Sequence, residues 1–416
     1  MIKRLALVVL LAASAHAEIT AIKARRMFDG RSDTLRENVV VVVENGRIVS
    51  VGSSVPANAK VIDLGDRTLL PGLIDCHTHV ALHAGDYDGQ ILRETPEFRT
   101  IVATINGRKT LDAGVTTIRD LGNEGAGYAD IALRDAVAKG LVESPRIIAA
   151  IRPVTSTGGY RMVGYSPYNA TPPLSSAADG VVEVRREVRK LVAEGADVIK
   201  AYMESYEKKQ TRTDVLSGAE NYSQEEISAL AEEAHRAGVK VAAHTYTDAA
   251  ARMAIEAGVD SIEHGLYLKE ETFRLMAQKG IVYVPTLMVY EMWRDGQLFG
   301  GATGEMKARL VRTCDEHAAS FKRALATPVK IAFGSDTFEK PGTNPLELEY
   351  MAKYGMRNPD VLRAATSSAA ALVGVDAGVI EVGKLADLIA VEGNPLTDIH
   401  AIEKVTFVMR EGKVIR

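Results

Sequence analysis

Short apolar runs and amphipathic segments alternate along most of the 416-residue chain. Apolar runs bounded by turn residues are typical of strands that are buried on both faces. We expect such strands at residues 73–79, 116–120, 146–150, 198–202, 239–244, 261–264, 282–285 and 330–334. Helical spacing marks the segments between them, among them 181–194, 224–237, 248–257 and 269–279. This alternation predicts an α/β fold, a (β/α)8 TIM-type barrel.

Glycines stand directly after predicted helices and just before the next predicted strand. They are Gly114, Gly195, Gly238, Gly258 and Gly280. Glycine adopts the left-handed conformation that ends many helices, so we expect a helix C-cap at each of these positions.

Both ends of the chain have the pattern of small antiparallel sheets. Near the N-terminus, Asn45-Gly46 separates two alternating runs, and Glu411-Gly412 does the same near the C-terminus. Asn-Gly between apolar runs is a strong hairpin signal. Each end is too small to be stable alone, so we expect residues 18–71 and 375–416 to pair into one small β-sandwich domain. Residues 72–374 would then form the barrel.

The first 17 residues have the pattern of a cleavable signal peptide. A short cationic start precedes an apolar stretch from Leu5 to Ala13, and small residues flank His16 before Glu18. The apolar stretch is shorter than the ~20 residues that a spanning helix needs. We therefore expect export to the periplasm or the medium without a stable membrane anchor; an uncleaved N-terminal anchor is the alternative.

Composition and charge narrow the class of partner. The net charge is −4 and the chain carries no basic block, which argues against nucleic acid and anionic membranes. A small-molecule substrate is the better expectation, and the pattern leaves a homo-oligomer open. The two cysteines, Cys76 and Cys314, form no Cys-x-x-Cys pair, so any metal would be held by nitrogen and oxygen.

Chemically active side chains occur where predicted strands end. They are His77, His79, Lys200, His244, His264 and Asp336. His77 and His79 are two positions apart in a strand, so their side chains lie on one face. Four imidazoles and one carboxylate suit zinc or a similar divalent ion. Lys200 is interpreted as a carbamate that bridges two metal ions, with a salt bridge at a strand end as the alternative.

The chain resembles the amidohydrolase superfamily in a series of ordered motifs. They are LPGLIDCHTH (70–79), AGVTTIRD (113–120), VIK (198–200), SIEHG (261–265), GSD (334–336) and GKLADLI (383–389). Within that superfamily it looks most like the imidazolonepropionase-related branch, which includes Xaa-Pro and Xaa-Arg dipeptidases and ochratoxin-hydrolysing amidases. The resemblance implies that His77 and His79 bind one metal, that His244 and His264 bind the other, and that carbamylated Lys200 bridges them.

The same resemblance implies the chemistry. A water shared by two divalent cations, most simply zinc, would attack the scissile carbonyl while Asp336 moves its proton to the leaving nitrogen. We therefore expect hydrolysis of an amide bond in a dipeptide or an N-acyl amino acid, including amides of the ochratoxin type. A cyclic-amide hydrolase or deaminase on the same barrel is one alternative, and a catalytically inactive binding protein is another.

Four further residues are candidates for contact with the substrate. Tyr160 stands after Gly158-Gly159, where related enzymes often have a histidine, and it could donate to a developing oxyanion. Arg152 and Arg161 could bind a substrate carboxylate. Tyr202 lies two positions after Lys200 and faces the same way. A structural role is the alternative for each of the four.

Overall fold

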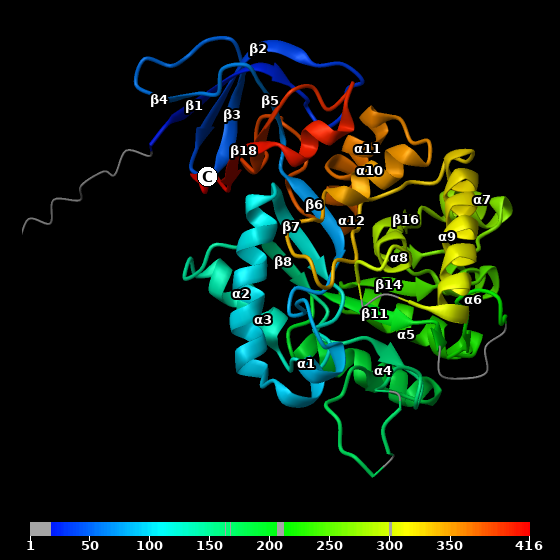
Figure 1. Cartoon of the computed structure of the whole chain (residues 1–416). Helices are drawn as coiled ribbons and strands as arrows, with labels where there is room; N and C mark the ends of the chain where they lie inside the picture. The colour runs from blue at the N-terminus through cyan, green and yellow to red at the C-terminus, as the bar shows by residue number, and fades with distance from the viewer. Residues whose placement is uncertain (1–17, 163, 167, 206–211, 299–301) are drawn as a thin grey trace, which may run out of the picture.

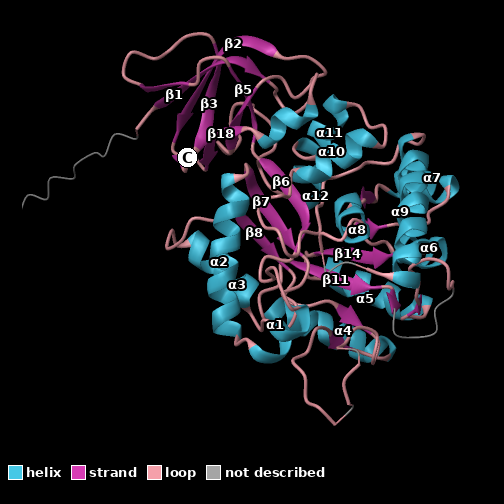
Figure 2. Cartoon of the chain, viewed as in Figure 1, coloured by secondary structure: helices cyan, strands magenta, loops and turns pink. Residues whose placement is uncertain are grey.

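The computed structural model describes residues 18–162, 164–166, 168–205, 212–298 and 302–416. It has a mixed β-sheet at one end and a larger part in which helices surround parallel strands (Figures 1 and 2). The predicted signal peptide, residues 1–17, lies outside the described residues.

The mixed sheet is built from both ends of the chain. Its eight strands are β1 (Thr20–Met27), β2 (Arg36–Glu44), β3 (Arg47–Gly52), β4 (Lys60–Asp63), β5 (Arg67–Pro71), β17 (Leu388–Glu392), β18 (Val405–Arg410) and β19 (Lys413–Val414). Strand β1 pairs parallel with β4 and β5 whereas the other pairs are antiparallel, so the prediction of purely antiparallel pairing is wrong at β1. Strands β5 and β17 pair antiparallel, with Leu70 opposite Ile389, and so join the two ends. Both predicted hairpins are confirmed, since Asn45, Gly46, Glu411 and Gly412 all have positive φ.

Parallel strands carry the rest of the fold. They are β6 (Leu73–Thr78), β7 (Val115–Asp120), β8 (Arg146–Ala149), β9 (Val154–Thr155), β10 (Ser176–Ala177), β11 (Val198–Tyr202), β14 (Lys240–Thr245), β15 (Ser261–His264) and β16 (Val282–Val284). A short hairpin, β12 (Glu204–Ser205) and β13 (Ala219–Glu220), follows β11. Seven of the eight predicted strands are confirmed to within one residue at each end.

The prediction of a regular strand at residues 330–334 is wrong. Within this segment only Ile331 forms a β-bridge, an isolated parallel one to Tyr283. The reason is competition for hydrogen bonds, because residues 364–365 share the same edge. Phe333 donates its N–H to Ala364, and Ala365 accepts from Ile74 of β6.

Backbone hydrogen bonds nevertheless connect the parallel strands into a ring. Asp197, just before β11, donates to Ala149 of β8 over 2.8 Å. On the other side, Cys76 of β6 donates to Phe333 over 2.9 Å, and Ala332 donates to Tyr283 of β16 over 2.9 Å. The carboxyl ends of consecutive strands therefore meet at one rim.

Helices flank these strands and alternate with them along the chain (Figure 1). They are α1 (Tyr87–Arg93), α2 (Pro96–Asp112), α3 (Ala129–Ala138), α4 (Gly180–Ala193), α5 (Gln224–Arg236), α6 (Asp248–Ala257), α7 (Glu270–Lys279), α8 (Leu287–Arg294), α9 (Gly304–Leu325), α10 (Leu346–Lys353), α11 (Asn358–Ala364), α12 (Ser367–Val373) and the 3-10 turn η1 (Ile399–Glu403). The four helices predicted by range are confirmed to within one residue, and all five predicted cap glycines have positive φ. Within the described ranges, no helix is long and apolar enough to cross a membrane.

The main core lies between the strands and the inner faces of these helices. Ile199, Val241, Ile262 and Phe333 are completely buried there. Both cysteines are also buried, and neither forms a disulfide. A rigid, apolar support of this kind can hold polar side chains in place at the rim above it.

Gly334→Ala tests the close approach of residues 330–334 to the strands beside them. A Cβ at position 334 would lie 2.3 Å from Cγ1 of Val284 and 2.9 Å from Cβ of His77. We expect this overpacking to cost about 1–3 kcal/mol in the free energy of unfolding. Gly52→Ala is the control, because nothing lies within 4 Å of its added Cβ. Equal thermal denaturation midpoints for the two variants would contradict this packing.

Candidate metal centre

The structure brings all six predicted ligands to the same rim, and all six are buried. They are His77, His79, Lys200, His244, His264 and Asp336. His77 lies on β6 and His79 directly after it, while Lys200, His244 and His264 lie near the ends of β11, β14 and β15. Five of the six line a cavity of about 540 Å³, and Lys200 is completely buried.

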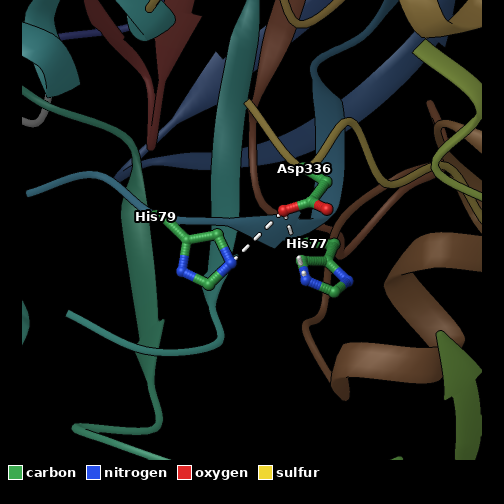
Figure 3. A group of neighbouring side chains, drawn as sticks. All are labelled: His77, His79 and Asp336. Atoms are coloured by element: carbon green, nitrogen blue, oxygen red, sulfur yellow. Dashed lines mark ion pairs between the residues drawn. The ribbon is translucent and has the colours of Figure 1, made fainter. Parts of the chain in front are cut away.

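His77, His79 and Asp336 have the geometry of a metal-binding group. Each offers one ligand atom, and the three atoms lie within 4.8 Å of one another. Figure 3 shows both imidazoles turned toward the carboxylate. Oδ1 of Asp336 is 3.3 Å from Nε2 of His79 and 3.6 Å from Nε2 of His77. This buried oxygen makes no hydrogen bond of good geometry to any described residue, so the set suits a cation.

Hydrogen bonds at Nδ1 orient three of the imidazoles. His77 bonds through Nδ1 to Glu263 over 2.8 Å, and His79 to the backbone oxygen of Gly122 over 2.7 Å. Nδ1 of His264 lies 2.8 Å from Oγ1 of Thr286. For His77 and His79 this leaves Nε2 directed toward Asp336. Such partners hold a ligating histidine in one orientation and one tautomer.

Glu263 is a functional residue that the sequence analysis missed. Its carboxylate accepts from His77, from the Arg119 guanidinium over 2.8 Å and from the Ser261 hydroxyl over 2.5 Å. Arg119 also donates to the backbone oxygen of Cys76, one residue before His77. The available signal was a glutamate within an otherwise buried strand, because such a carboxylate must be paired.

Lys200 is completely buried, and among the described residues it has no carboxylate within salt-bridge distance. Its Nζ lies 3.4 Å from Nε2 of His77, which is a proposed ligand atom. Burial lowers the pKa of Lys200 to about 8, although the carboxylates of Glu263 and Asp336 oppose the shift. The salt bridge that was the alternative interpretation of Lys200 is absent from the described part of the chain.

Three of the four imidazoles have the neutral form that metal binding requires. Burial holds the pKa values of His77, His244 and His264 well below the usual range, and nearby Lys200 adds to the effect. These three rings are therefore neutral and can donate a lone pair. Burial also lowers the pKa of His79, but Asp336 outweighs it and raises the value to about 9. The positive charge of protonated His79 thus sits where a cation would balance Asp336.

Unusual backbone conformations cluster around the same rim. His264, Thr286 and Asp336 have φ values of 67°, 50° and 53°, in the left-handed region. Glu124 and Ile151, after β7 and β8, have φ values of 52° and 67°. Non-glycine residues in this region cost of order 1–3 kcal/mol each and gather at functional sites.

Three of the four predicted substrate contacts line the cavity, and the fourth does not. Tyr160, Arg161 and Tyr202 line the cavity. Arg152 does not, because its guanidinium bonds to Ser176 over 2.8 Å and to Glu194 over 3.3 Å. The hydroxyl of Tyr160 donates to Glu124 over 2.7 Å, so its single proton is already engaged.

Aromatic rings dominate the cavity wall. Besides the two predicted tyrosines it includes Tyr87, Tyr246, Tyr290, Trp293 and Phe338. The Phe338 ring stacks on His79 with a centroid distance of 4.8 Å. Arg309 of α9 also lines the cavity and was not predicted. These residues come from loops and outer helices, whose approach to the rim is not visible in the periodicity of the chain.

The chain belongs to the amidohydrolase family, whose model matches residues 68–415. It is 32% identical to an ochratoxinase from Aspergillus niger over 98% of this chain and 88% of that protein. It is 29% identical to an imidazolonepropionase from Maricaulis maris over 85% of this chain and 86% of that protein. The superfamily predicted from the motifs is confirmed.

Solved structures of similar proteins support the same family assignment. A Xaa-Pro dipeptidase with methionine bound in its active site has a TM-score of 0.85 and 33% identity, covering 96% of this chain and 100% of the other. A prolidase in complex with N-methylphosphonate-L-proline has a TM-score of 0.84 and 31% identity, covering 96% of this chain and 99% of the other. The protein is therefore a hydrolase that acts on amide bonds, in a family that generally uses divalent metals.

Glu263→Gln tests the support of His77. The change leaves the buried Arg119 guanidinium without its counter-charge, so we expect a loss of about 3–5 kcal/mol in the free energy of unfolding. Metal binding should weaken by about 10- to 100-fold, because His77 loses its anionic partner. Ser261→Ala is the control, since it removes one neutral donor to the same carboxylate and one neutral acceptor of Arg119 but leaves the ion pair of Glu263 and Arg119. Wild-type melting and metal retention in Glu263→Gln would contradict this role.

Proposed function

We propose that the protein is a binuclear metal-dependent hydrolase that cleaves the amide bond of dipeptides or N-acyl amino acids. The observation that carries this proposal is the burial of Lys200 beside His77, with Nζ 3.4 Å from Nε2 and no carboxylate of a described residue within salt-bridge distance. A lysine that becomes a carbamate is an anion, and an anion is what two neighbouring cations need between them. The ochratoxinase and dipeptidase likenesses support the substrate class.

The residues divide into two ligand sets. His77 and His79 would hold one ion, His244 and His264 the other, and carbamylated Lys200 would bridge them, with Asp336 as a further ligand. All of these donor atoms are nitrogen or oxygen, a set that fits zinc among other divalent ions. When bound, two such ions lower the pKa of a shared water and polarise the scissile carbonyl.

Asp336 performs the proton transfer in this proposal. Its carboxylate lies close to one histidine of each pair. Oδ1 is 3.3 Å from Nε2 of His79, and Oδ2 is 3.8 Å from Nδ1 of His264. It accepts a proton from the attacking water and then donates it to the leaving nitrogen. The strained backbone at Asp336 and the 2.8 Å hydrogen bond from its N–H to the backbone oxygen of His77 hold the carboxylate in this place.

The cavity indicates what surrounds the scissile bond. Its aromatic wall favours a large apolar group on the substrate, and Arg161 and Arg309 bring positive charge to a substrate carboxylate. Tyr202 remains a candidate contact, and an oxyanion contact from Tyr160 would need its proton to leave Glu124.

The domain architecture and the cellular location of the protein are part of the same proposal. The hydrogen-bonded ring of strands supports a (β/α)8 barrel formed by residues 72–374. The sheet built from both chain ends supports a small β-sandwich domain from residues 18–71 and 375–416. The pattern of residues 1–17 supports export to the periplasm or the medium.

A hydrolysis screen of the metal-reconstituted enzyme tests the substrate class. We expect release of free amino acids from dipeptides and N-acyl amino acids, with preference for bulky apolar groups because of the aromatic cavity wall. Cyclic amides and purines serve as the comparison set. Turnover of that set alone would refute the proposal in favour of a cyclic-amide hydrolase or deaminase.

Asp336→Asn separates proton transfer from metal binding. The amide keeps an oxygen ligand but cannot accept the proton, so we expect bound metal to remain while kcat falls by about 10²- to 10⁴-fold. Metal content by elemental analysis and kcat on one dipeptide are the two measurements. Full turnover in this variant would refute the assignment.

Lys200→Met tests the bridge. Methionine fills a similar volume but forms no carbamate, so we expect loss of bound metal together with activity. Lys240→Met is the matched control, because Lys240 begins β14 and donates to the backbone oxygens of Ala371 and Leu372, away from the cavity. Normal metal content in Lys200→Met would exclude a bridging carbamate.

A further inference from the structure

The ring of His244 lies in a stack of aromatic rings that runs along the rim. Tyr202 faces it with a centroid distance of 4.2 Å and an interplanar angle of 16°. Tyr160 faces the other side of Tyr202 at 4.6 Å and 15°. The three rings, from the loop after β9 and from strands β11 and β14, are thus nearly parallel, and such stacking restrains how each ring can turn.

A buried carboxylate anchors the outer end of this stack. The hydroxyl of Tyr160 donates to Oε2 of Glu124 over 2.7 Å, and the hydroxyl of Tyr87 donates to the same oxygen over 2.7 Å. Glu124 is 1% exposed and its backbone is left-handed, with φ of 52°. Because its hydroxyl donates to this buried carboxylate oxygen, the Tyr160 ring is fixed at its far edge.

The middle ring of the stack contacts a second proposed ligand. Nζ of Lys200 lies 5.5 Å from the centroid of Tyr202. Tyr202 therefore borders both His244 and Lys200, which come from neighbouring strands β14 and β11. A shift of this ring would disturb both side chains at once.

We infer that Glu124, Tyr160 and Tyr202 are positioning residues that hold His244 in place for its metal ion. This inference rests on the proposed function, which makes His244 a ligand. It gives Tyr160 a different task from the predicted oxyanion contact, because its proton serves the anchor at Glu124. Glu124 acts on His244 only through the two intervening rings.

Chelator competition on the metal-loaded enzyme tests the inference with two matched pairs. Tyr160→Phe and Tyr87→Phe each remove one 2.7 Å hydrogen bond to Glu124 and the 3.2 Å hydrogen bond between the two hydroxyls, but only Tyr160 belongs to the stack. Tyr202→Leu removes the middle ring, and Tyr202→Phe retains it. We expect one of the two metals to be released about tenfold more easily in Tyr202→Leu, and by a smaller factor in Tyr160→Phe.

Tyr87→Phe and Tyr202→Phe should hold both metals as the wild type does. The visible spectrum of the Co²⁺-loaded enzyme should change at one site in Tyr202→Leu and recover in Tyr202→Phe. If Tyr202→Leu and Tyr160→Phe released metal to the chelator as slowly as the wild type does, the inference would be overturned while the proposed function would stand. The same holds if Tyr87→Phe lost metal as easily as Tyr160→Phe. A wild-type protein that binds no divalent metal would instead refute the proposed function, and the inference with it.

Discussion

A buried lysine side chain that forms no salt bridge with any described residue is the constraint on which the proposed site depends. Removing an ammonium from water costs several kcal/mol unless a partner compensates, yet Lys200 is completely buried, with Nε2 of His77 3.4 Å away. Three nearby imidazoles have pKa values held low by burial, so they remain neutral and can donate a lone pair to a metal ion. The arrangement makes physical sense when Lys200 is an anionic carbamate and cations lie between it and the histidines.

The scaffold keeps these groups in place through backbone and buried polar contacts. Parallel strands end at one rim, and the proposed ligands lie in or directly after the carboxyl-terminal halves of those strands. Glu263 and Arg119 join the His77 ring to the backbone beside it, so a polar network extends below the site into the core. Strained conformations at His264 and Asp336 persist because the close-packed core holds the chain around them.

Periodicity and strand-end logic predicted the features that are encoded locally. Seven strands and the cap glycines follow from apolar spacing, and the meeting of the six proposed ligands at one rim follows from polar residues near the ends of apolar runs. Contacts between distant segments account for what was missed. Residues 364–365 take hydrogen bonds that a regular strand at 330–334 would need. Glu194 and Ser176 hold Arg152 away from the cavity, and Glu124 acquires its role only when Tyr87 and Tyr160 meet it.

Anomalous diffraction from crystals of the metal-loaded enzyme tests the central claim most directly. The account predicts two metal peaks, one beside His77 and His79 and one beside His244 and His264, with carboxylate density attached to Nζ of Lys200 between them. A single peak beside His77, His79 and Asp336, together with an unmodified lysine, would contradict it.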